Sequence, residues 1–161
     1  KRLNRKVKAF SIEKASTIGV VYNATNRDDA EAVKKFIQYL KEERKDVISL
    51  GFIDTKDSSG IVKSHLSYNY FDRKDLSKSL IPKGNDVQDF LSNPFSILID
   101  LNIAECFPIE YIAGLSMAKF KVGAKGDYRD NTCDMIIDIE EKKQLSFLII
   151  QIKHYLKMIK N

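Results

Sequence analysis

Residues 95–124 place a short apolar strand, a loop, a helix and a second strand in direct succession, and this order limits the folds open to the chain. The apolar run at residues 96–99 ends at Asp100, Pro108 opens a helical stretch, and residues 119–123 close the unit. Open α/β sheets are built from such units, and their ligand crevices lie at the carboxyl ends of the strands. The stretch therefore predicts a fold class and the place of a site, but no reaction.

Strand-like and helix-like stretches alternate through most of the remaining sequence. Compact apolar runs predict strands at residues 17–22, 47–53 and 135–139. Apolar residues at helical spacing predict a helix that ends near residue 43 and further helices at residues 86–92 and 143–160. Thr25 with Asp28, or Asn26 with Asp29, fits the start of the first helix.

This alternation predicts one α/β domain over residues 15–161, a three-layer αβα sandwich around a Rossmann-like, mainly parallel sheet. The pattern is weak between residues 61 and 84, where Leu66, Tyr68 and Tyr70 alternate and residues 75–80 suggest one helical turn. No helix fits between Val122 and Met135, which leaves room for one antiparallel strand at an edge of the sheet.

The excess of positive over negative charge comes from a basic N-terminal arm, residues 1–14. The arm has six basic residues and one acid and so carries the whole formal net charge of +5, while the other residues include 21 basic and 21 acidic side chains. A nucleic-acid-binding domain would show a basic face on its folded body. We predict either a solvated tail or a short amphipathic helix, with Leu3, Val7 and Phe10 on one side, that meets an anionic partner.

Four polar residues at predicted strand ends form the candidate ligand crevice. Asp100 and Asn102 follow one strand, and Asn23 and Thr25 follow another, so all four would meet if these strands are neighbours. The glycines form neither phosphate-binding signature, G-x-G-x-x-G or G-x-x-x-x-G-K-[ST]. Acidic residues lie at the start of the first predicted helix and around the start of the helix that Pro108 opens. They would repel a phosphate, so the expected ligand is neutral or cationic.

The motifs that usually carry chemistry are missing from the sequence. It has no G-x-S-x-G element and no metal-ligand spacing of histidines and cysteines, so we predict no catalytic, metal-binding or cofactor-binding residue. Cys106 and Cys133 are too few for a disulfide framework and are expected to be reduced, which favours a cytoplasmic protein. No apolar run is long enough to span a bilayer.

The C-terminal helix shows two apolar stripes. One is broad and predicts contact with the sheet, while Phe147, Ile150, His154 and Met158 lie on roughly the opposite side. Either the helix is wedged between the sheet and another segment, or this second face is a homodimer contact.

Two resemblances accompany these patterns. The sequence resembles an uncharacterised bacterial family, a domain of unknown function, over residues 17–24, 94–102, 107–113 and 118–123. A narrower likeness joins Asp100-Leu101 and the segment 116–123 to the acceptor-side domain of lipopolysaccharide heptosyltransferases, whose nucleotide-binding domain is absent here. The second resemblance implies an α/β fold.

The leading functional hypothesis is a non-catalytic binding or interaction module of a soluble α/β fold. An enzyme or small-molecule-binding protein acting on a sugar-like polar ligand at the strand ends is the first alternative. A protein that associates with RNA or anionic lipid through the basic arm is the second.

Overall fold

The computed structural model describes residues 4–59 and 68–160 and shows an open sheet of six parallel strands in the order β3-β2-β1-β4-β5-β6. The strands are β1 (Thr17–Asn23), β2 (Asp46–Ile53), β3 (Tyr68–Asp72), β4 (Ile97–Asp100), β5 (Phe120–Ala124) and β6 (Met135–Ile137). The helices are α1 (Arg27–Glu42), α2 (Asn85–Ser92), α3 (Phe107–Leu115), α4 (Arg129–Thr132) and α5 (Leu145–Met158), with the short 3-10 helix η1 (Arg73–Asp75) after β3.

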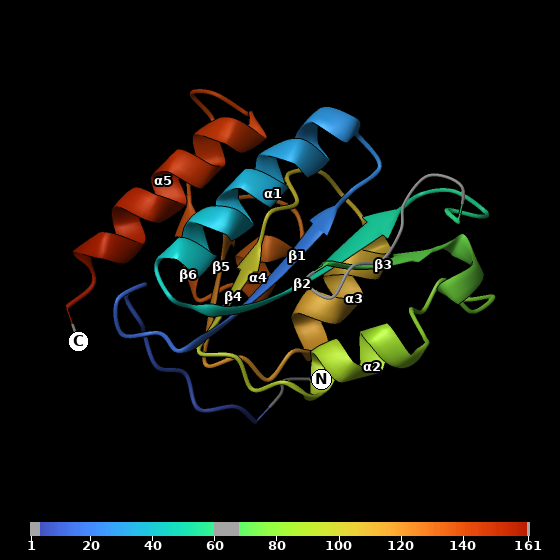
Figure 1. Cartoon of the computed structure of the whole chain (residues 1–161), viewed down its shortest axis with the longest axis horizontal. Helices are drawn as coiled ribbons and strands as arrows, with labels where there is room; N and C mark the ends of the chain where they lie inside the picture. The colour runs from blue at the N-terminus through green and yellow to red at the C-terminus, as the bar shows by residue number, and fades with distance from the viewer. Residues whose placement is uncertain (1–3, 60–67, 161) are drawn as a thin grey trace.

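Helices cover both faces of the sheet, which confirms the predicted three-layer sandwich. Helices α1 and α5 lie side by side on one face, and α2 and α3 cover the other (Figure 1). Alternate residues of β1 serve the two layers, since Val20 belongs to the core under α1 and α5 whereas Val21 belongs to the core under α2 and α3. Both faces are buried, as a parallel sheet requires.

The prediction of one antiparallel strand at an edge of the sheet is wrong. β6 pairs with β5 in parallel, from Val122 opposite Met135 to Ala124 opposite Ile137. The crossover needs no full-length helix because the single turn α4 and the buried side chain of Arg129 hold the connection against the sheet.

Element boundaries agree with the sequence patterns except near β3. Asn26, not Thr25, caps α1, and its side chain accepts a hydrogen bond from the Asp29 amide at 3.0 Å. The helical turn predicted at residues 75–80 lies earlier, at η1, because Asp72 and Asp75 form a capping box there. Leu66 lies outside the described residues.

Close packing of the sheet depends on Gly19 in β1. A Cβ atom at this position would lie 2.6 Å from the ring of Phe95, which is buried and packs against Phe90 with ring centroids 5.0 Å apart. Only glycine leaves room for that ring beside β1.

Candidate functional site

The sheet reverses its strand order between β1 and β4, and the candidate crevice lies at the carboxyl ends of these two strands. Asn23 is the last residue of β1, Thr25 follows β1 and Asn102 follows β4. All three line one cavity of about 410 Å³. Asp29 at the start of α1 and Leu145 at the start of α5 also line it, and the loop after β4 adds Leu101, Ile103 and Ala104. A topological switch point is where open α/β sheets bind their ligands.

Local hydrogen bonds fix the loop between β1 and α1. The Asn23 side chain accepts from the Thr25 amide at 3.0 Å, and the Thr25 hydroxyl accepts from the Asp54 amide at 2.9 Å. With Asn26 capping α1, the polar wall of the cavity is held in place before any ligand arrives.

The cavity suits a neutral or cationic ligand better than an anion. The lining that the structure describes contains the carboxylate of Asp29 and no basic side chain. Asp28 and Asp29 also lie in the first turn of α1, where they complement the positive end of the helix dipole and oppose a second anion.

Asp100, the fourth candidate residue, lies beneath the cavity and does not line it. It is 1% exposed, and its two carboxylate oxygens accept hydrogen bonds. The Tyr128 hydroxyl donates one at 2.6 Å, and the backbone N–H of Asn102 donates the other at 2.9 Å. Burial raises the pKa of Asp100 to about 6, although these hydrogen bonds and the charge of Arg129 act in the other direction. The Asp100 carboxylate therefore supports the loop that carries Asn102.

Two residues of this buried cluster, Tyr128 and Arg129, were not identified from the sequence. Arg129 is 1% exposed and donates to the carbonyl oxygens of Ala124 and Ile103, each at 2.8 Å. It thus ties the end of β5 to the loop after β4. The sequence shows both residues only as part of a polar turn, and nothing local to them indicates burial.

The two cysteines are free thiols, and both are half-buried. Burial raises the pKa of Cys106 and of Cys133, and the charge of Asp100 adds to both shifts. Such thiols remain protonated at neutral pH and are poor nucleophiles.

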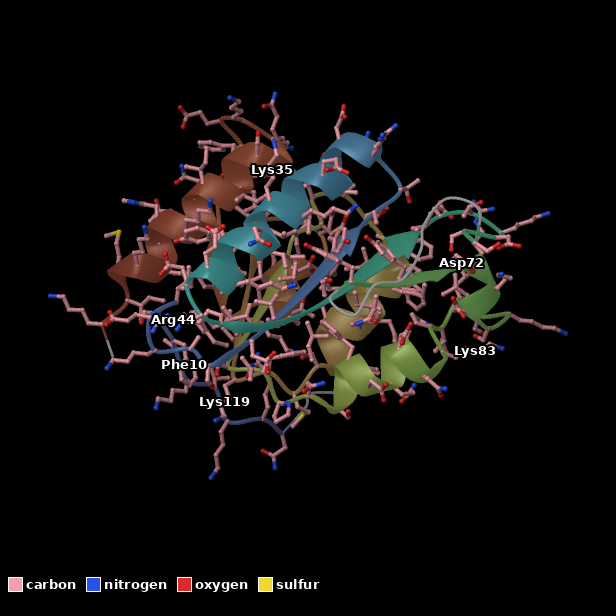
Figure 2. The ribbon with its side chains drawn as sticks, viewed as in Figure 1. Phe10, Lys35, Arg44, Asp72, Lys83 and Lys119 are labelled. Carbon is pink, nitrogen blue, oxygen red and sulfur yellow. The ribbon has the colours of Figure 1, made fainter. Side chains whose placement is uncertain are left out.

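The described part of the arm has no helix, so the amphipathic helix is wrong for residues 4–10; Leu3 lies outside the described residues. Arg5 instead forms an ion pair with Asp134 at 2.6 Å, and the Lys8 amide donates to the Lys119 carbonyl at 3.0 Å. Figure 2 shows Phe10 and Lys119 beside each other at the amino edge of the sheet, the side on which its parallel strands begin. The described arm is therefore a strap along that edge, not a free tail.

The second face of α5 divides between burial and exposure. Phe147 is half-buried and packs against the core, whereas Ile150 is 59% and Met158 61% exposed, and His154 is also exposed. The hydrogen bonds and the ion pair described for the arm join it to Lys45, Ala118, Lys119 and Asp134.

The fold and the switch-point crevice define an α/β domain of the Rossmann-like class. The chain belongs to a family of unknown function, DUF6913, which matches residues 1–159. No curated protein matches the sequence. Among the described residues, no helix combines the length and apolar character needed to cross a membrane.

Proposed function

We propose that this domain is a non-catalytic binding module that holds a small, hydroxyl-rich ligand, neutral or cationic, at its switch point. The observation that carries the proposal is that Asn23, at the end of β1, and Asn102, in the loop after β4, line one cavity together with Asp29. Asn23 Oδ1 already accepts from the Thr25 backbone and Asn102 Nδ2 already donates to the Ala104 carbonyl. A ligand hydroxyl would therefore accept from Nδ2 of Asn23 or donate to Oδ1 of Asn102. A cavity of about 410 Å³ is in the range of small-molecule sites.

The non-catalytic assignment rests on the position of Asp100. Its carboxyl group has the raised pKa of a general acid, about 6, but it is fully buried behind Asn102 and bonded to Tyr128. A general acid has to reach the atom that it protonates. The local likeness to heptosyltransferases favours sugars as the first ligands to test, and the alternative of an enzyme acting on them requires a carboxylate that reaches the cavity.

Calorimetric titration of the chain with glucose, glucosamine and glucose 6-phosphate tests the proposal. We expect saturable binding of the two unphosphorylated sugars, tightest for glucosamine, and none of the phosphate. Asp29→Asn should weaken glucosamine binding by about fivefold, the size of one partly exposed ion pair. Asp28→Asn, in the same helical turn but outside this cavity, is the matched control. Lack of saturation by all three sugars, or tight binding of the phosphate, would reject the proposal.

A homodimer through α5 is a second proposal, favoured by the spacing of its exposed stripe. Ile150 and Met158 lie four residues on either side of His154, so an antiparallel crossing on a two-fold axis places Ile150 of one copy against Met158 of the other. Ile150→Asp should convert a dimer to a monomer in light scattering at tens of micromolar, whereas Ile136→Asp on the edge strand should not. A monomeric wild-type chain would exclude this dimer.

An anionic partner for the arm remains a proposal supported by Lys6, Lys8 and Lys119, which are exposed at the amino edge. Deletion of residues 1–14 should then abolish binding to anionic vesicles and to RNA, and unchanged binding would contradict it. The cytoplasmic placement is supported by the free thiols alone.

A further inference from the structure

A second cavity, of about 570 Å³, lies on the other side of Asn23. It is bounded by the end of β2, the loop after η1 and the start of α3. It is distinct from the candidate crevice at the carboxyl ends of β1 and β4. The two cavities share only Asn23 among their described lining residues. Its volume is that of a small-molecule site.

Apolar side chains form much of its wall. Phe52 is buried at the end of β2 and is backed by Phe71, with ring centroids 5.0 Å apart. Leu76 and Leu80 approach from the loop after η1, and Phe107, 45% exposed, stands at the start of α3. A ligand that reaches this wall has to bring an apolar group.

The polar groups around the cavity carry an excess of negative charge. Arg73 is already bonded to Asp54, with Nε 2.6 Å from the carboxylate. Glu105 is the second carboxylate, and it pairs with no cation among the residues that the structure describes. The thiol of Cys106, whose pKa is raised by burial and by the charges of Asp100 and Asp54, stays neutral. Among the lining residues that the structure describes, the negative charge of Glu105 is thus left for a ligand to balance.

The loop after η1 holds Leu80 over the cavity at a conformational cost. Leu80 has a φ of 65° and is 54% exposed. The Ser77 hydroxyl accepts from the amides of Ser79 and Ile81, at 3.2 and 3.1 Å, and the Leu80 amide donates to the Ser77 carbonyl at 2.9 Å. A left-handed, exposed leucine is an unfavourable choice for a turn that glycine would form more easily.

We propose that this cavity binds a small amphipathic cation, an aromatic or branched apolar group that carries an ammonium. The apolar group packs between Phe52, Leu80 and Phe107, and the ammonium pairs with Glu105. This inference goes beyond the proposed function and does not depend on it, because the two cavities take different ligands.

The test is titration of the full chain with tryptamine, in which NMR records the backbone amide chemical shifts at each addition. Indole-3-propionate supplies the same apolar group with the opposite charge, and ethylammonium supplies the charge alone. Glu105→Gln should weaken tryptamine binding by about fivefold. Glu110→Gln, an exposed acid in the first turn of α3 and outside the cavity, should leave tryptamine binding unchanged.

Saturable shifts near Phe52 and Cys106 with tryptamine, and none with the other two probes, would support the proposal. It would be overturned if tryptamine failed to saturate, if indole-3-propionate bound as tightly, or if Glu105→Gln bound like the wild type. Leu80→Gly should raise Tm and weaken tryptamine binding, and an unchanged affinity would contradict the packing assigned to Leu80. Tryptamine binding without sugar binding would support this site and reject the proposed function.

Discussion

Replacement of Asp100 by Asn is expected to remove a pH dependence of stability that its buried carboxyl group causes. Burial raises the pKa of Asp100 from 3.8 to about 6 in the folded chain. Since the folded pKa lies above the unfolded one, the stability associated with the protonated carboxyl is fully present below the unfolded value. It is then lost as the pH rises through about 6. Each unit by which folding raises the pKa corresponds to about 1.4 kcal/mol. The rise from 3.8 to about 6 therefore corresponds to a loss of ~3 kcal/mol over the whole titration.

Urea unfolding of the wild type and of Asp100→Asn at pH 4 and pH 8 measures this effect. Circular dichroism is the suitable signal because the chain has no tryptophan. The difference in unfolding free energy between the two proteins should change by ~2 kcal/mol between these pH values, in favour of the variant at pH 8. Asp138→Asn, an exposed acid, is the matched control and should show no such change. An equal difference at both pH values would mean that folding leaves the pKa of Asp100 unaltered.

Three further predictions concern packing and the arm, and urea unfolding measures each. Gly19→Ala should cost about 1–3 kcal/mol because the new methyl group meets the Phe95 ring, and less in a Phe95→Leu background; an equal loss in both would contradict the clash. Arg129→Met should cost about 3 kcal/mol because buried carbonyl groups lose their donor, and a loss below 1 kcal/mol would mean that water replaces it. Arg5→Gln should cost about 1 kcal/mol, and a double-mutant cycle with Asp134→Asn should show coupling; additive losses would disprove the ion pair's contribution.

The fold could be predicted because its signals are local. The apolar run that forms β1 and the capping residue Asn26 act within a few positions of each other, and the resulting elements agree with the structure. The direction of β6 could not be predicted in this way. A parallel crossover usually contains a full helix, but here the single turn α4 and the bonds of Arg129 to carbonyl groups of other elements replace it.

The candidate crevice was only partly predictable for a related reason. Asn23, Thr25 and Asn102, chosen for their positions at strand ends, line one cavity because neighbouring parallel strands end on the same side of the sheet. The same rule placed Asp100 in the crevice, whereas its hydrogen bond to Tyr128 draws it into the core. Twenty-eight residues separate these two side chains, so no local pattern could reveal their contact.

The strap formed by the arm affects the order in which the chain folds during synthesis. Arg5 leaves the ribosome well before its partner Asp134, which follows 129 positions later. At roughly 5–20 residues per second, the arm waits on the order of ten seconds without its docking site. The closure of the amino edge is therefore a late step, and it occurs only after β5 and the segment that follows it have been made.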